Sequence, residues 1–351
     1  MKIAICASEG APYAKSGGLG DVMEALPSAL ARIAGNEVVL FLPYYHKIKT
    51  NTAYMVERVA EIRVQLGWRQ QYCGIMKLTN RNDGVQVYFL DNDYYFGART
   101  GAIYGDMDDG ERFAFFSKAA LEAMPRIGFY PDVLHAHDWQ AAMSIALLRM
   151  QYGKSPDYRR VRTVYTIHNL KYQGVFNWPF MDELLSIGAE HFTGEGLEYY
   201  GDINFTKGAL VYSDAITTVS PTYAGEIQSP EYGETLDGVL RWRSRDIYGI
   251  MNGIDESLFD PATDKAIYAN YSLEDMSGKE KCKESLRTEF WLDKDASPII
   301  GMVTRFTDQK GLDLVEYAIS ALMEKGVQLA VLGSGDARYE HLFSWASWRY
   351  G

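Results

Sequence analysis

The sequence predicts an α/β protein with two successive units, each built on a parallel sheet that helices cover. Short apolar, β-branched runs alternate with segments of helical periodicity, which is the pattern of strand–helix units. This alternation begins afresh after Arg241. The chain has 351 residues, more than one hydrophobic core usually holds. We therefore expect a complete first domain at residues 1–244 and the start of a second domain at residues 245–351.

Six strands are expected in the first domain, because six short apolar runs have strand length and lie between polar or helical segments. They are residues 2–7, 37–42, 85–90, 133–137, 162–167 and 215–219. A helix is expected over residues 19–33, where apolar side chains recur every three or four positions and form one buried stripe. Pro27 lies inside this helix and should bend it locally.

The second domain is expected to begin with the same alternation. Its strands are residues 247–251, 298–303 and 327–332, and its first helices are residues 274–287 and 312–325. An aromatic helix with Phe343, Trp345 and Trp348 follows. About 100 residues is short for such a domain, and so apolar a helix needs a surface to pack against. We therefore expect the second domain to continue beyond Gly351.

The composition excludes several classes of partner. With 35 basic and 46 acidic residues the net charge is −11, and an acidic surface repels nucleic acid and anionic membranes. The sequence has no run of about eighteen apolar residues and no signal-peptide pattern at its start. Cys6, Cys73 and Cys282 lie far apart and indicate neither a disulfide framework nor a zinc site. These features favour a cytoplasmic protein that binds neither nucleic acid nor membrane.

A glycine-containing loop joins the first strand to the first helix. Lys15 and Ser16 are followed by the pair Gly17 and Gly18. Glycines let the backbone approach a ligand closely, and the N–H groups at a helix start favour an anion. The loop therefore suits a diphosphate, although an isolated Gly-Gly pair is more often an ordinary tight turn. The loop does not have the dinucleotide-binding pattern G-x-G-x-x-G, so the sequence does not favour a nicotinamide-dependent enzyme.

The fourth strand ends in two histidines, His135 and His137, and is followed by Asp138 and Trp139. Ligands of open parallel sheets bind outside such strand ends. The two histidines point to one face, but no third ligand lies nearby in sequence, so structural histidines are favoured over a metal pair. A carboxylate accepts hydrogen bonds from sugar hydroxyls, and an indole face can cover a pyranose. Asp138 and Trp139 therefore predict a sugar site.

The fifth strand is followed by a second polar segment, which begins with His168 and Asn169 and includes Tyr172. A histidine beside amide groups can place a polar group against a reacting sugar, whereas a lone histidine is more often structural. The position of His168, parallel to the previous strand end, favours the functional interpretation. We therefore expect His168 at the reacting sugar.

In the second domain, Arg305 and Lys310 lie between a strand and a helix. Two permanent positive charges at such a junction suit a phosphate group, although surface Lys and Arg are usually only solvated. Gly333 follows the next strand, as Arg305 follows the previous one, but by itself it is only weak evidence for a phosphate site. Residues 93–112 are rich in Gly, Asp and Tyr, which predicts a long surface loop and a functional candidate.

Together these segments resemble the bacterial glycogen synthases and plant starch synthases along essentially the whole chain. Residues 15–21 resemble K-[ST]-G-G-L-x-D, residues 135–139 resemble H-x-H-D-W, and residues 168–174 resemble H-N-x-x-Y-Q-G. The segments at 219–227, 252–255 and 305–311 are similar to T-V-S-P-T-Y-A-x-E-I, N-G-[IV]-D and R-x-x-x-Q-K-G-[LI]-D. Each motif alone is weak, but six in the right order are specific.

The resemblance implies the GT-B fold of glycosyltransferases, in which two Rossmann-like domains face each other across the active-site cleft. It implies transfer of glucose from ADP-glucose to the 4-hydroxyl at the non-reducing end of an α-1,4-glucan, glycogen or starch, with retained anomeric configuration. Neither a metal nor a cofactor is implied. The expected residues are, for donor binding, Lys15, Gly17, Gly18, Asn252 and Gly333, for catalysis, His168, Arg305 and Lys310, and for the sugar or acceptor, Asp138, Trp139, Asn169 and Tyr172.

One departure limits what the resemblance implies. The family's E-P-C-G-L segment, whose glutamate holds the donor sugar, does not occur in these 351 residues, and most of the nucleoside pocket is missing with it. The choice between ADP- and UDP-glucose therefore stays open, and we expect the chain alone to bind glucan weakly without synthase activity. Two alternatives remain: a retaining transferase for another nucleotide sugar, and a non-catalytic glucan-binding relative.

Overall fold

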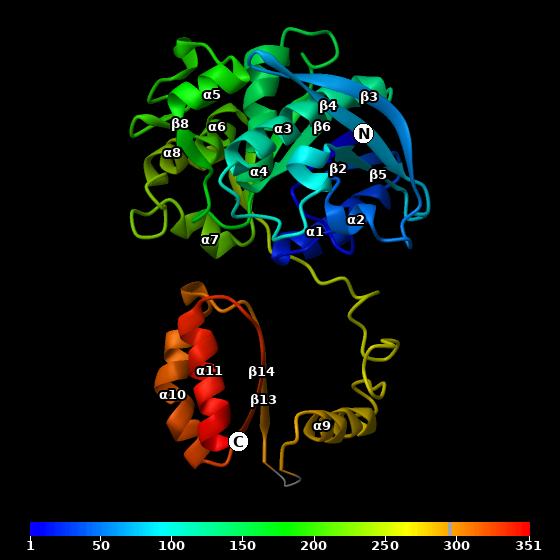
Figure 1. Ribbon diagram of the computed structural model, residues 1–351, viewed down its shortest axis with the longest axis vertical. Helices are drawn as coiled ribbons and strands as arrows, with labels where there is room; N and C mark the ends of the chain where they lie inside the picture. Colours follow the sequence, from blue (N-terminus) through cyan, green and yellow to red (C-terminus); the bar gives the residue numbers. More distant parts are fainter. Residues whose placement is uncertain (294–296) are drawn as a thin grey trace. The chain divides into compact units, whose positions relative to one another are not determined.

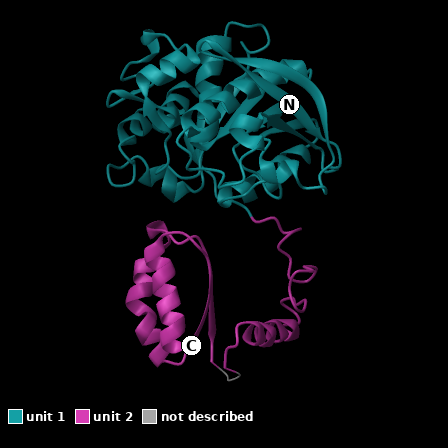
Figure 2. Cartoon of the chain, viewed as in Figure 1, with its two compact units in different colours: residues 1–253 teal, residues 254–351 magenta. Residues whose placement is uncertain are grey.

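The chain forms two compact units. The computed structural model describes residues 1–293 and 297–351. Unit 1 comprises Met1–Gly253 and unit 2 comprises Ile254–Gly351 (Figure 2). Both units are α/β, as the alternation of strand and helix patterns predicts.

Unit 1 is built on one nine-stranded sheet with the order β12-β11-β7-β6-β1-β2-β5-β4-β3. Figure 1 shows the neighbouring strands β3 and β4 at one end of this sheet. Seven strands run parallel, and β4 and β3 add an antiparallel edge. All six strands expected for the first domain are present. The bounds are β1 Lys2–Cys6, β2 Glu37–Pro43, β3 Val56–Leu66, β4 Arg69–Leu78, β5 Val85–Asp91, β6 Val133–His137, β7 Arg162–Ile167, β11 Ala215–Thr218 and β12 Ile247–Gly249.

The sheet contains three strands that the sequence analysis did not place there. β3 and β4 form a hairpin with a register shift between Arg58 and Ala60. β12 was expected to open the second domain, but it pairs in parallel with β11, with Ile216 opposite Ile247. The expected placement of residues 247–251 in the second domain is corrected: residues 247–249 form the edge strand of the first sheet, and unit 1 continues to Gly253. A strand's own residues do not specify its partner, so the pattern could not assign it.

Helices cover both faces of the sheet, because the chain crosses the sheet in two directions. α1 (Gly18–Ala31) links β1 to β2, whereas α4 (Asp138–Leu147) follows β6 and contacts β7 on the other side of β1. The connection from β1 to β2 and the connection from β6 to β7 run in opposite directions across the sheet. Because strand–helix–strand crossovers are right-handed, the helices of these two connections lie on opposite faces of the sheet. α1 keeps Pro27 inside it, as expected, and buries Leu19 and Met23.

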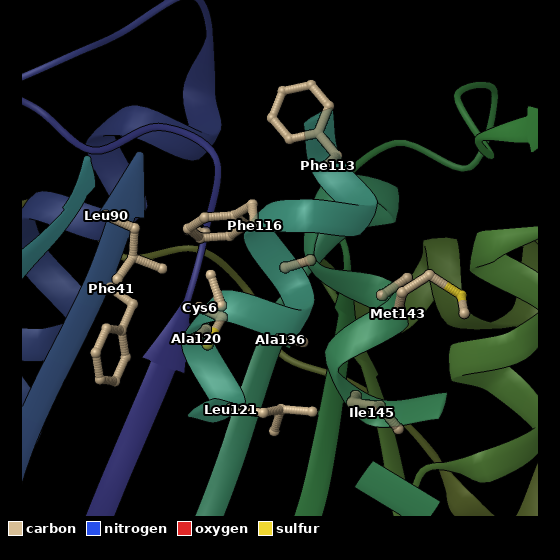
Figure 3. Packing of buried hydrophobic residues seen from close by; sticks show 14 of the residues in the cluster. Cys6, Phe41, Leu90, Phe113, Phe116, Ala120, Leu121, Ala136, Met143 and Ile145 are labelled. Carbon is tan, nitrogen blue, oxygen red and sulfur yellow. The ribbon is translucent and has the colours of Figure 1, made fainter. Parts of the chain in front are cut away.

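The main hydrophobic core lies between the central strands and α3 (Asp109–Arg126). Cys6 of β1, Phe41 of β2 and Phe116 and Ala120 of α3 are completely buried in it (Figure 3). The remaining elements of unit 1 are α2 His46–Lys49, η1 Asp93–Gly97, η2 Leu148–Tyr152, β8 Val175–Asn177, α5 Trp178–Leu185, η3 Ala189–His191, β9 Glu198–Tyr199, β10 Asp202–Asn204, α6 Phe205–Tyr212, α7 Pro221–Glu226, α8 Asp237–Trp242 and η4 Ser244–Asp246.

Unit 2 has a two-stranded parallel sheet and a small core. β13 pairs with β14, and Phe306, Leu312 and Tyr339 form the buried cluster. Large apolar side chains such as Tyr317 and Trp348 are exposed, at 92% and 80%. The elements are α9 Ser277–Glu289, β13 Ile299–Val303, η5 Asp308–Lys310, α10 Leu312–Glu324, β14 Gln328–Leu332 and α11 Ala337–Tyr350.

Candidate active site

The carboxyl ends of neighbouring parallel strands bring together the expected site residues of unit 1. β11, β7, β6 and β1 are adjacent, so these ends lie at one edge of the sheet, where ligands of such sheets bind. β6 ends at His137, whose register partner on β7 is Thr166. His168, two residues further along, therefore lies beside His137, and Nδ1 of His137 is 2.9 Å from Nε2 of His168.

Asp138 shapes the turn that carries His168. Its Oδ1 accepts a hydrogen bond of 2.8 Å from the backbone N–H of His168, and its carboxylate also accepts one from the backbone of Asn169. Its φ of 54° is in the left-handed region, which costs a non-glycine residue energy and is typical of functional sites. Burial raises the pKa of Asp138, while the nearby His168 ring and these N–H groups lower it. The carboxylate thus orients the two residues expected at the sugar.

Trp139 lies mainly inside an aromatic cluster. Its ring is 5.2 Å from Phe113 in an edge arrangement and 5.6 Å from Phe176, and only 9% of the residue is exposed. Gly174, with φ of +66°, lies so close that an added Cβ would be 2.5 Å from the indole. The expectation of an open indole face over a pyranose therefore needs adjustment, because only part of the ring is accessible.

That accessible part lines a cavity of about 630 Å³. Tyr172 contributes an aromatic ring, and Gln173 an amide whose Nε2 donates to the carbonyl oxygen of Glu234 at 2.8 Å. Carboxylates and hydroxyls complete a polar wall suited to sugar hydroxyls. The lining residues are Gly105, Asp106, Asp109, Trp139, Lys171, Tyr172, Gln173, Gly174, Val175, Phe176, Tyr199, Glu234 and Thr235.

Glu9 organises the glycine-containing loop. Its Oε2 accepts hydrogen bonds from the backbone N–H of Ser16 and, at 3.2 Å, of Gly17. Burial raises the pKa of Glu9, these N–H groups lower it, and the nearby Asp138 raises it. Two amides of the expected diphosphate site are therefore already bound by a carboxylate. The remaining attraction for an anion comes from the start of α1, whose first N–H groups have no intrahelical acceptor.

The other two loop residues differ in their surroundings. Nζ of Lys15 forms an exposed ion pair of 2.5 Å with Asp21, which offsets its charge. At Gly18, no described atom outside its chain neighbours and the adjoining helix backbone lies within 4 Å of the position of a Cβ. The backbone is thus open to a ligand at Gly18, and Lys15 must exchange its partner to bind a diphosphate.

In unit 2, the structure places Arg305 and Gly333 together. Both line a cavity of about 470 Å³, with Val303, Thr304, Leu332 and Ser334. A Cβ at Gly333 would be 2.2 Å from the carbonyl oxygen of Thr304, so close packing requires glycine there. Lys310, in the short helix η5, is exposed and is not among the lining residues. Neither Arg305 nor Lys310 forms an ion pair with another residue in the described part of the chain.

The remaining expected residues are partly outside these sites. Asn252 is exposed in the segment after β12. Asn169 is not a lining residue of the cavity, and its Oδ1 accepts from the backbone N–H of Lys171 at 3.1 Å. Sequence reasoning missed Glu9, Asp109 and Glu234. The Asp-rich segment 93–112 was a signal for Asp109, whereas the other two lie in segments with no distinctive pattern.

The histidines of β6 are bound to protein groups. Nε2 of His135 is 2.6 Å from Oγ1 of Thr166, and burial lowers the pKa of His135 to about 3. Within residues 1–293 and 297–351, no group of three or more His, Cys, Asp or Glu side chains could hold a metal ion. Among the helices of these same residues, none is both long and apolar enough to span a bilayer.

An open parallel sheet with an anion-suited loop and a polar, partly aromatic cavity at its carboxyl edge defines a class of protein. Together with a second α/β unit that presents cations at a strand–helix junction, it is the arrangement of a GT-B glycosyltransferase. Comparison with known proteins narrows this class. Residues 2–242 match the family model described as the starch synthase catalytic domain.

Similar proteins support the same family. The chain is 47% identical to a glycogen synthase of Clostridium novyi, over 100% of the chain and 72% of that protein. It is 49% identical to a glycogen synthase of Geobacillus stearothermophilus, over 98% of the chain and 70% of that protein. It also superposes on the catalytic domain of starch synthase IV from Arabidopsis thaliana bound to ADP and acarbose. That match has a TM-score of 0.91 and 31% identity, and covers 99% of this chain and 71% of that one.

The chain belongs to the starch synthase catalytic domain family, as its motifs indicated. It is a glycosyltransferase of glycogen synthesis that acts by glucosyl transfer, with a nucleotide sugar and a glucan as substrates. The GT-B fold expected from the resemblance is also confirmed. A sucrose-phosphate synthase from Thermosynechococcus elongatus, with 16% identity and a TM-score of 0.55, shares the fold alone.

Proposed function

We propose that the donor is ADP-glucose and that glucose passes to the 4-hydroxyl at the non-reducing end of an α-1,4-glucan with retained configuration. The starch synthase IV structure that matches this chain is bound to ADP and acarbose, which supports this choice of nucleotide. The matching glycogen synthases support glycogen as the acceptor and a cytoplasmic location. Two catalytic domains are proposed, with the boundary expected at residue 244 moved to residue 253, because β12 pairs with the first sheet.

The observation that carries the proposal is the polar cluster at the carboxyl edge of the sheet. His168 is held by His137 through its ring and by Asp138 through its backbone, so its orientation is set before substrate binds. In glucosyl transfer the sugar gains positive charge while the leaving diphosphate gains negative charge. Groups that are already oriented toward such charges stabilise the transition state without a reorganisation cost. We propose that His168 lies against the donor glucose.

The donor diphosphate is proposed to bind cationic and backbone groups. In unit 1 these are Lys15, Gly17 and Gly18, and the open space at Gly18 supports close approach of a phosphate. In unit 2 the cavity beside Arg305 and Gly333 supports a second set.

The exposed charge of Lys310 and the amide of Asn252 complete the proposed donor site. Arg305 and Lys310 would neutralise the diphosphate as it leaves, because negative charge grows there during transfer.

The acceptor glucan is proposed to bind the cavity of about 630 Å³ in unit 1. Tyr172 and the accessible part of Trp139 offer apolar surface for a sugar ring, while Asp109, Gln173 and Glu234 line the cavity with polar groups. Asp138 and Asn169 act from behind, because they form the turn that leads to Tyr172.

The donor preference can be tested directly. The enzyme for this assay is a chimera in which residues 1–351 are followed by the remaining residues of a matching glycogen synthase. Incorporation of radiolabelled glucose into glycogen would be compared for ADP-glucose and UDP-glucose, and the products digested with an enzyme specific for α-1,4 linkages. We expect ADP-glucose to be preferred and the label to be released. A preference for UDP-glucose, or a label that resists digestion, would refute the proposal.

A further inference from the structure

Three imidazole rings lie in a row at the carboxyl edge of the sheet. The rings of His135 and His137 are 4.0 Å apart between centroids, and those of His137 and His168 are 5.2 Å apart. His137, in the middle, has no exposed surface. Its Nδ1 is hydrogen-bonded to Nε2 of His168 at 2.9 Å. Its Nε2 is buried and has no hydrogen-bond partner among the described residues.

The shared hydrogen bond holds one proton, so the two rings have two possible arrangements. In one arrangement His137 carries the proton on Nδ1 and donates it, and His168 accepts at Nε2. In the other arrangement His168 donates from Nε2, and neutral His137 must then carry its own proton on the buried Nε2. That N–H would have no acceptor in its surroundings. Orphaned buried N–H groups are rarer in proteins than acceptors with an unused lone pair, which favours the first arrangement.

We propose that His137 is a positioning residue that holds His168 in the tautomer with its proton on Nδ1. His168 then offers an N–H donor, and not a bare ring nitrogen, to whatever binds at the strand edge. A hydroxyl or ring oxygen of a sugar is the chemistry that such a donor recognises. The inference deepens the proposed function, because it rests on His168 being the group that meets the sugar.

The neighbours of His137 are consistent with this assignment. His135 uses Nε2 for Oγ1 of Thr166 at 2.6 Å, and Asp138 binds the backbone N–H of His168 rather than a ring. His137 also stays uncharged, because burial lowers its pKa well below the usual range, and the neighbouring His135 and His168 lower it further. Nδ1 of His168 has no hydrogen-bond partner in the described part of the chain, so it is available to a ligand.

The tautomer can be observed in the chain itself, without substrate. The sequence contains six histidines, so ring ¹⁵N labelling followed by long-range ¹H–¹⁵N correlation spectra gives few signals. His168→Asn identifies the signals of His168 by their loss. We expect a protonated Nδ1 and an unprotonated, accepting Nε2. A proton on Nε2 of His168 in the unaltered chain would overturn the proposal, whether or not any variant folds.

Two substitutions of His137 distinguish a hydrogen-bonding role of this residue from a role in packing alone. In His137→Asn the side-chain amide takes the place of Nδ1 and can still donate, so the tautomer of His168 should be kept. In His137→Gln the amide takes the place of Nε2, and the ratio of Nδ1–H to Nε2–H forms of His168 should fall about fivefold or more, as expected for one lost hydrogen bond. His135→Asn is the matched control, because His135 makes no hydrogen bond with His168, and it should leave the ratio unchanged.

The outcomes distinguish this inference from the proposed function. An unchanged ratio in folded His137→Gln, verified by an unaltered melting temperature, would contradict the role of His137. If the tautomer is as expected but His168→Ala leaves turnover intact in the chimera, the proposed function of His168 fails while the role of His137 stands.

Discussion

The two units hold their proposed functional groups in different ways. In unit 1, hydrogen bonds fix three polar side chains at the edge of a sheet with a large core. Glu9 is bound to the loop that follows it, and Asp138 and His168 are bound to residues about thirty positions away in the sequence. In unit 2, Arg305 and Lys310 are exposed beside a two-stranded sheet whose buried cluster has three residues. Unit 1 therefore supplies oriented polar groups, whereas unit 2 supplies charge.

Oriented dipoles and mobile charges contribute to catalysis differently. A group fixed by packing acts at full strength on the transition state, because nothing has to reorganise. An exposed cation must first exchange water, and its contribution depends on a closed, dry site. We therefore expect unit 1 to be sensitive to changes of shape, and unit 2 to changes of charge.

The largest expected effect is on the synthase activity of unit 1 when only residues 254–351 follow it. The chain of residues 1–351 should show no incorporation of glucose from ADP-glucose into glycogen, whereas the chimera described above should be active. The reason is that catalysis needs all groups within hydrogen-bond reach at once, and the chain spans 72% of the length of the matching Clostridium novyi glycogen synthase. Incorporation by residues 1–351 comparable with the chimera would contradict this prediction, because unit 1 would then be active with residues 254–351 alone.

The next effect concerns the cations of unit 2. Arg305→Ala and Lys310→Ala in the chimera should each lower kcat about a hundredfold or more, since one lost contact to a developing anion costs on the order of 3 kcal/mol. Arg305 should be the more sensitive, because it lines the cavity with Gly333.

Arg338→Ala is the matched control for these two cations. Arg338 pairs with Glu316 on the surface of unit 2 and should be nearly neutral. Turnover close to normal in both Arg305→Ala and Lys310→Ala would remove these residues from the catalytic machinery.

A smaller effect is expected on stability when a glycine of the same backbone conformation is replaced by alanine in each unit. Gly174 in unit 1 and Gly311 in unit 2 have nearly the same φ, +66° and +65°. A Cβ at Gly174 would be 2.5 Å from Trp139, whereas at Gly311 the nearest atom, of Leu314, is 3.6 Å away. Both alanine variants pay the left-handed cost of about 1 to 2 kcal/mol. Gly174→Ala should lose a further 1 to 3 kcal/mol or so through overpacking.

Hydrogen exchange of backbone amides reports the opening free energy of each unit separately. Gly101→Ala is the control, since its φ is not in the left-handed region and no described atom lies within 4 Å of a Cβ there. Equal losses in Gly174→Ala and Gly311→Ala would show that packing around the two glycines does not differ in the way the contacts indicate.

Much of the fold could be predicted from local patterns. Apolar runs gave the six parallel strands of the first domain, and the spacing of Leu19 and its neighbours gave α1. The hairpin of β3 and β4 and the placement of β12 could not be predicted in the same way. Their positions depend on which strand each one pairs with, and pairing is decided by burial across the whole sheet.

The candidate site was predictable in place but not in detail. Strand ends and glycines pointed to the edge where His168 and the loop at Gly18 lie. The sequence did not show that Glu9 binds the loop, nor that Asp138 uses its carboxylate on the backbone of His168. Both contacts are hydrogen bonds from the backbone to a side-chain carboxylate, one local and one between strand ends, and such contacts leave no periodic signal in a sequence.

The most direct test of the account is the kinetics of His168→Ala in the chimera. Because His168 is held by His137 and Asp138 before substrate binds, it should act on the transition state more than on donor binding. We predict that kcat falls on the order of a hundredfold while KM for ADP-glucose changes little. An increase in KM with unchanged kcat would contradict the account, because His168 would then only bind the donor.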